Sequence, residues 1–159
     1  MMPLKVLAFA AISDRIGMVV LHGEKLKDWQ TTEKVAKSSV DAAAYAQEII
    51  NSYRPHVVVT ERLGIDNRKG AATQKLIAAM EMVAEHNSVI HVATEHHHSF
   101  PSKYEEAAAL VAIYPALQPW LPKKRRIFDH QPRSMVLFEA LSLANCVAHG
   151  GAGPLAAAM

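Results

Sequence analysis

The stretch that decides the fold is HVVVTERL, residues 56–63. Its three consecutive valines follow a turn signal at Arg54–Pro55, and a run of β-branched residues between turn signals is typical of a buried strand. Strands covered by helices on both faces show continuous apolar runs of this kind, without alternation. Glu61 stands at the carboxyl end of this strand, where open α/β sheets place their binding crevice. Glu61 is therefore the first candidate for a functional side chain, and the alternative is a solvated glutamate at a strand end.

The length and composition indicate a soluble globular protein. The 159 residues suit one domain over residues 1–149, followed by a flexible tail rich in glycine and alanine over residues 150–159. The single cysteine, Cys146, excludes an intramolecular disulfide and fits a cytoplasmic protein. The apolar run near the N-terminus is too short to span a bilayer, so we expect no membrane contact. The formal net charge of +2 does not by itself indicate nucleic-acid binding.

Hydrophobic periodicity predicts an α/β fold. Apolar runs predict strands over residues 5–12, 16–21, 26–32, 56–61 and 89–94. Helical spacing of apolar residues predicts helices from residue 38 or 39 to residue 54, and over residues 71–86, 104–117 and 133–148. Short turns join the first three strands into an antiparallel meander, and helices connect the later strands, which makes them parallel. We expect a mixed five-stranded sheet flanked by helices.

This order of elements is that of the ribonuclease H-like fold, and three stretches resemble the RuvC-type Holliday junction resolvases. VLAFAAISDRIGMVV, residues 6–20, resembles the opening hairpin of that family, with Gly17 at the place of a returning glycine. VVVTERL has Glu61 where the family places a glutamate at the end of the fourth strand. FEALSLA, residues 138–144, follows KKRRIFDHQPRS and resembles the last helix of the family.

The resemblance covers about residues 5–148, but two of the four carboxylates that it implies are missing. Ala10 stands where the family has an aspartate in the first strand, and Val136 stands at the first of two acids in the last helix. Glu61 and Glu139 remain, and the resemblance makes them the candidate catalytic and metal-binding residues. Nucleases of this fold use two ions, Mg²⁺ or Mn²⁺, which activate a water and stabilise the leaving oxygen. Two acids could hold one such ion weakly, but they are too few to hold two at the required separation.

Three further acids are candidates for a rearranged metal site. Glu95 ends a strand next to that of Glu61, and Asp129 precedes the last helix. Asp14 lies four residues after Ala10, which is on the order of 10 Å further along an extended chain. Asp14 would reach the site only if the turn folded back.

Three consecutive histidines, residues 96–98, follow the strand that ends near Glu95. Imidazoles can bind a transition metal, and consecutive residues in a loop can converge through suitable turns. The preferred alternative is a solvated polar loop.

A basic cluster precedes the last helix and is a candidate for binding the phosphates of branched DNA. Its members are Lys123, Lys124, Arg125, Arg126 and Arg133. Lys69 and Lys75, with Arg68, would extend this surface if the loop after Glu61 faces the crevice. The alternative is a solvated charge run near a helix start.

Three hypotheses of function follow. The first is a degenerate RuvC-like protein that binds nucleic acid and has weak or no nuclease activity. The second is an active Mg²⁺- or Mn²⁺-dependent endonuclease with a rearranged carboxylate site. The third is a scaffold or oligomerisation module that kept the fold without the ligand. A homodimer through the helix over residues 71–86 is also possible, with Met80, Met82 and Val83 as candidate contacts, although core packing explains most of that apolar stripe.

Overall fold

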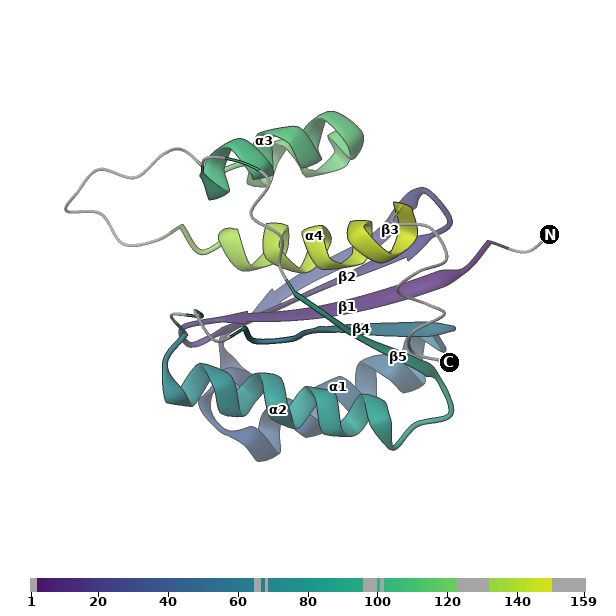
Figure 1. Ribbon diagram of the computed structural model, residues 1–159, viewed down its shortest axis with the longest axis vertical. Coiled ribbons are helices and arrows are strands. Elements are labelled where there is room, and N and C mark those ends of the chain that lie inside the picture. The colour runs from purple at the N-terminus through teal and green to yellow at the C-terminus, as the bar shows by residue number, and fades with distance from the viewer. Residues whose placement is uncertain are drawn as a thin grey trace.

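A mixed five-stranded sheet runs through the middle of the molecule, and helices cover both of its faces (Figure 1). The computed structural model describes residues 3–64, 67, 69–95, 100, 102–122 and 132–149, with the side chain of His149 excepted. The strands are β1 (Lys5–Ile12), β2 (Arg15–His22), β3 (Lys25–Thr32), β4 (Val57–Glu61) and β5 (Ile90–Thr94). The helices are α1 (Ser39–Tyr53), α2 (Ala71–Glu85), α3 (Lys103–Ile113) and α4 (Met135–His149), with 3₁₀ turns η1 (Lys34–Lys37) and η2 (Pro115–Trp120). No helix in this described part is long and apolar enough to cross a membrane.

The strand order in the sheet is β3-β2-β1-β4-β5. β1 and β2 pair antiparallel, as do β2 and β3, whereas β4 pairs parallel with both β1 and β5. This arrangement confirms the predicted meander extended by parallel strands. It also places β4, the strand of residue 61, next to the central strand β1.

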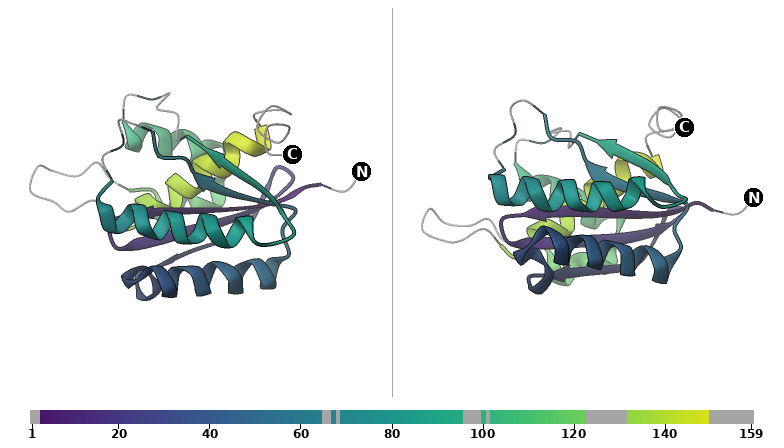
Figure 2. Two further views of the ribbon diagram at one scale, coloured as in Figure 1. Left: turned by 60° about the horizontal axis from the view of Figure 1, so that its bottom comes forward. Right: turned by 90° about the horizontal axis from the view of Figure 1, so that it is seen from below.

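The two faces of the sheet carry separate cores because successive side chains of a strand point to opposite faces. On β1, Val6, Ala8 and Ala10 pack on the side of α4, whereas Leu7 and Phe9 pack on the side of α1 and α2. Figure 2 shows α1 and α2 side by side across the strands, and Figure 1 shows α4 on the opposite face with α3 outside it. Both faces of β1 are therefore buried, which explains its continuous apolar sequence.

The helix predicted over residues 104–117 is wrong beyond Ile113. α3 begins after Ser102, whose hydroxyl accepts a hydrogen bond from the backbone N–H of Glu105 at 3.2 Å. It ends before Tyr114, because the residue that precedes a proline is disfavoured in the α conformation. The chain continues from Pro115 as the 3₁₀ turn η2 instead.

Gly17 lets α4 approach the sheet closely. Gly17 lies opposite Ala10 in the antiparallel pair of β1 and β2. A Cβ atom on Gly17 would lie 2.7 Å from the backbone oxygen of Val136 in α4. Because this neighbour is backbone, it cannot move aside as a flexible side chain would. The glycine that the sequence singled out therefore has a packing role, which is to hold α4 against β2.

We expect Gly17→Ala to destabilise the protein by about 1–3 kcal/mol, because the new methyl group overpacks the contact between β2 and α4. Urea unfolding measures the change. Gly64→Ala is the matched control, since a Cβ there meets its nearest neighbour at an ordinary 3.8 Å. A Gly17→Ala variant as stable as Gly64→Ala would contradict the close approach of α4.

Candidate carboxylate site at the carboxyl end of the sheet

Two buried carboxylates meet where β4 ends beneath α4. Val57 and Val59 pack on the α4 side of the sheet, so alternation places Glu61 on the same side. Because Ala8 pairs with Val59, Ala10 is opposite Glu61 two residues further along the parallel pair. Helix α4 brings Glu139 to this point. Glu61 is 7% exposed and Glu139 is 4% exposed, so neither is a solvated glutamate.

The ammonium group of Lys69 lies between these two carboxylates. Its Nζ atom donates to Oε1 of Glu61 at 2.7 Å and to Oε1 of Glu139, and it also donates to the backbone oxygen of Ala11 at 2.7 Å. An ammonium has three hydrogens to donate, so these three acceptors use all of them. The Lys69 side chain is 16% exposed. The group is thus a largely buried cation held by β1, β4 and α4 together.

The backbone around Lys69 is held by side chains on both sides of it. The side chain of Asn67 donates to the oxygen of Gly64 at 2.8 Å and accepts from the N–H of Lys69 at 3.2 Å. The side chain of Gln74, in the first turns of α2, donates to the oxygen of Lys69 at 2.7 Å. These bonds aim Lys69 at the sheet, which the sequence pattern did not reveal. The sequence predicted that Lys69 lies on an outward basic surface and contacts phosphate, whereas its ammonium points inward to the end of the sheet.

The two carboxyl groups have different acidities. Burial raises the pKa of Glu61, and the neighbouring Glu139 raises it further, which outweighs the attraction of the Lys69 ammonium. Burial also acts to raise the pKa of Glu139, but the Lys69 ammonium and the Glu61 side chain outweigh it and leave this pKa lowered. Glu61 is therefore the member of the pair that takes up a proton first.

The apolar residues Ala10 and Val136 lie in the same core cluster on this face of the sheet, and both are fully buried. They bear out the reading of the sequence that no acid faces the site from the middle of β1 or from the first turn of α4. The oxygens that the Lys69 ammonium contacts come from the two carboxylates and the carbonyl of Ala11. The described residues hold no group of three or more His, Cys, Asp or Glu side chains that suits a metal ion.

Of the other predicted metal ligands, Asp14 and Glu95 lie in the described part of the chain, and neither forms a metal-binding group with this pair. The Asp14 side chain is 75% exposed and lies 4.0 Å from Nε of Arg15. Glu95 is exposed at the end of β5. Asp129 and the histidines of residues 96–98 lie outside the described residues.

The predicted basic residues divide into inward and outward groups. Lys75 is exposed on α2, and Arg133 is exposed just before α4, where it pairs with Glu33 at 2.9 Å. Residues 123–126 and residue 68 lie outside the described part of the chain. Lys103, at the start of α3, was missed, although its charge helps to lower the pKa of Glu139. No local pattern in the sequence indicated this proximity, because it depends on how α3 packs on α4.

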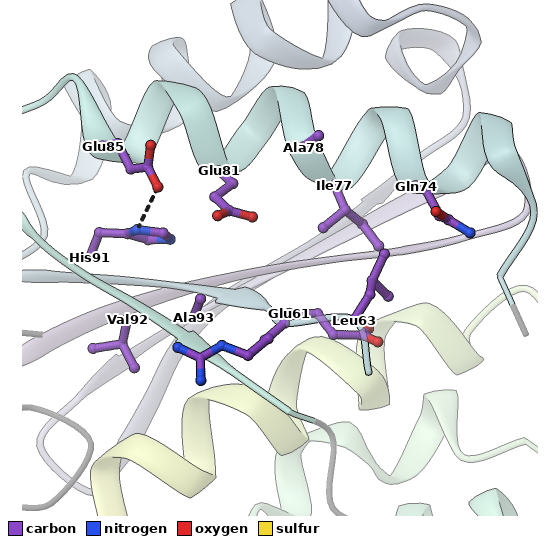
Figure 3. A pocket seen from close by; sticks show the side chains of 11 residues that line it. Glu61, Leu63, Gln74, Ile77, Ala78, Glu81, Glu85, His91, Val92 and Ala93 are labelled. Carbon is purple, nitrogen blue, oxygen red and sulfur yellow. Dashed lines mark ion pairs between the residues drawn. The ribbon is translucent and has the colours of Figure 1, made fainter. Parts of the chain in front are cut away.

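A cavity of about 430 Å³ lies between α2 and β5 (Figure 3). Glu85 of α2 and His91 of β5 face each other across it at 3.9 Å, and Nε2 of His91 lies 2.8 Å from the hydroxyl of Thr60. Thr60 precedes Glu61 on β4, so alternation points its side chain toward α2 and away from α4. The cavity is also lined by Glu61, so it reaches one member of the carboxylate pair at the carboxyl end of β4.

Met80, one of the candidate dimer contacts, is 1% exposed and packs in the core beneath α2. This residue cannot serve a dimer contact, because its side chain fills the space between α2 and the sheet. Met82 is 59% exposed. The homodimer stays a prediction.

The structure matches solved structures of Holliday junction resolvases, which confirms the RuvC-like ribonuclease H-like fold. RuvC from Thermus thermophilus, solved in complex with a Holliday junction substrate, matches with a TM-score of 0.61 over 95% of this chain and 97% of that chain, at 15% identity. Fowlpox virus resolvase, solved with Holliday junction DNA, matches with a TM-score of 0.60 over 92% and 98%, at 10% identity. The yeast mitochondrial Holliday junction resolvase matches with a TM-score of 0.50 over 90% and 77%, at 12% identity. No protein-family model matches the sequence, and no curated protein sequence matches it.

The opposite pKa shifts predict opposite pH dependences for two isosteric variants. The lowered pKa of Glu139 gives stability that is present above the unfolded pKa of about 4.3 and is lost as pH falls through the folded pKa. The raised pKa of Glu61 gives stability that is present below about 4.3 and is lost as pH rises through the folded pKa. The free energy of unfolding that Glu139→Gln loses relative to the unsubstituted protein should be larger at about pH 7 than at about pH 3.5. The loss caused by Glu61→Gln should be smaller at about pH 7 than at about pH 3.5. Urea unfolding at both pH values tests this, and losses that change in the same direction would contradict it.

Removing the buried cation leaves two carboxylates facing each other without a counter-ion. We expect Lys69→Met to destabilise the protein by about 3 kcal/mol at neutral pH, because breaking a buried ion pair leaves an uncompensated charge. The measurement is urea unfolding. Lys75→Met is the matched control, since it removes the same charge from an exposed position on α2 and should change stability by less than about 0.5 kcal/mol. Equal losses in both variants would show that the ion cluster adds no stability.

Proposed function

We propose that this chain is a RuvC-like nucleic-acid-binding protein that binds branched DNA and has weak or no nuclease activity. The observation that carries the proposal is the carboxylate pair itself. In a resolvase fold, Glu61 and Glu139 share the ammonium of Lys69, while Ala10 and Val136 stand where two further acids are expected.

Metal-dependent cleavage needs more oxygen ligands than these residues supply. A two-ion mechanism places ions on both the attacking and the leaving oxygens of an in-line displacement. Mg²⁺ requires close to octahedral oxygen coordination and keeps several waters of its own. The two carboxylates here already bind an ammonium, and no third acid of the described residues lies with them. These facts support the loss or near loss of cleavage.

DNA binding is supported by the fold and by the position of the exposed basic groups. Two of the structural neighbours were solved with Holliday junction DNA. In this chain, Lys103 begins α3, Arg133 lies just before α4, and Arg62 follows the carboxyl end of β4. Because Lys69 offsets the negative charge of the carboxylate pair, the approach of a phosphate to this edge is less strongly opposed. The basic cluster of residues 123–126 and Arg133 remains the predicted main contact.

Binding of a four-way DNA junction, followed by fluorescence anisotropy in EDTA across a salt series, tests the proposal. We expect binding that weakens with salt, because phosphate contacts release counterions. Arg133→Ala should reduce the slope of log K against log salt by about 1, as loss of one phosphate contact does. Replacing Lys123, Lys124, Arg125 and Arg126 together by alanine should reduce it by about 3 to 4. Lys25→Ala is the control, since Lys25 pairs with His22 at the other end of the sheet and should leave the slope unchanged.

A linear duplex of the same length shows whether the branch is recognised, and incubation with Mg²⁺ or Mn²⁺ reports cleavage. No binding at low salt would favour the scaffold hypothesis. Efficient Mn²⁺-dependent cleavage that disappears in Glu61→Gln would instead establish an active endonuclease and contradict the proposal.

A further inference from the structure

We infer that the Lys69 ammonium is the resident cation of the carboxylate site and that it excludes Mg²⁺ and Mn²⁺ from it. The metal that the fold implies does not fit the residues present. This inference deepens the proposed function, because it names what takes the place of the metal. Its test measures metal binding without DNA, so it can fail independently of DNA binding.

The first argument is the set of contacts that the ammonium makes. It binds one oxygen from each of three separate elements: the end of β1 through Ala11, the end of β4 through Glu61, and α4 through Glu139. Oxygen ligands from several elements at the carboxyl end of a sheet are what a hard divalent cation would use. Here each of them faces a lysine N–H.

The second argument is that the same oxygens cannot serve both cations. Mg²⁺ binds its oxygen ligands at about 2.0–2.1 Å, which is closer than an N–H···O bond. An ion held between Glu61 and Glu139 would occupy the volume of the ammonium and repel its charge. Lys69 must therefore leave before such an ion can bind.

The third argument is that leaving is costly for this lysine. Its backbone is fixed on both sides by the bonds to Asn67 and Gln74. All three ammonium hydrogens already have acceptors, so withdrawal breaks three charge-assisted or carbonyl hydrogen bonds at once. Because Ala10 and Val136 are apolar, no further acid among the described residues joins Glu61 and Glu139 to bind an ion in place of the ammonium.

The inference also explains how the two remaining carboxylates can both be buried. A buried carboxylate is costly unless it is paired and hydrogen-bonded. Glu61 and Glu139 share one ammonium, and the lysine tail connects the loop before α2 to α4 on the far side of the sheet. The acids then serve to anchor Lys69.

The test is Mn²⁺ titration of the full chain, with free Mn²⁺ measured by its electron paramagnetic resonance signal. The variants are Lys69→Met, Lys69→Arg, which keeps a cation, and the matched control Lys75→Met. We expect Lys69→Met to bind Mn²⁺ at least tenfold more tightly than the unsubstituted protein, Lys69→Arg and Lys75→Met. Adding Glu139→Gln to Lys69→Met should abolish that gain.

Thermal unfolding with and without Mn²⁺ gives a second readout, because an ion that binds the folded state raises its stability. Lys69→Met should be stabilised by Mn²⁺, whereas Lys69→Arg and the unsubstituted protein should not. Tight Mn²⁺ binding by the unsubstituted protein that is lost in Glu61→Gln would overturn the inference. So would a folded Lys69→Met variant that gains no affinity. If Lys69→Met does not fold, Lys69→Gln replaces it in both measurements under the same two criteria.

Discussion

The buried ammonium of Lys69, shared by Glu61 and Glu139, connects the main parts of this molecule. It lies where β1 and β4 end, and it ties the loop before α2 to α4 across the carboxyl edge of the sheet. Removing the ammonium would leave two buried carboxylates without a cation between them, which is costly in a site with little water. The charge of the site and the pKa values of both glutamates depend on this contact.

The position of the carboxylate on α4 depends in turn on how closely that helix packs. Gly17 has no Cβ, so the backbone of Val136 can lie directly over β2. The small side chain of Ala10, opposite Gly17, continues this narrow surface on β1. Glu139 follows one turn after residue 136 and is thereby brought over the end of β4. The close contact between Gly17 and the backbone of Val136 thus places Glu139 where it meets Lys69.

The surface around the site is arranged differently from its interior. Inside, the Lys69 ammonium donates to Glu61, to Glu139 and to the backbone oxygen of Ala11. Outside, Arg133 shares Glu33 with Arg15 near the start of α4, and Lys75 is exposed on α2. Exposed charges of this kind act on a polyanion through long-range, salt-dependent attraction, whereas the buried cluster does not. The exposed basic groups and the buried ion cluster are therefore electrostatically distinct features of this chain.

The sequence by itself determined the sheet, because runs of β-branched residues such as residues 57–59 favour buried strands and short turns between strands favour antiparallel neighbours. It also singled out Glu61 and Glu139, and it showed that acids are missing at residues 10 and 136. The end of α3 was misplaced, since helical spacing outweighed the proline at residue 115 in the prediction. Only the tertiary structure decided the direction of Lys69, which the sequence placed on an outward basic surface. A lysine eight residues from one glutamate and seventy from the other has no local pattern that reports their contact. The packing of α4 and the bonds that hold the loop bring them together.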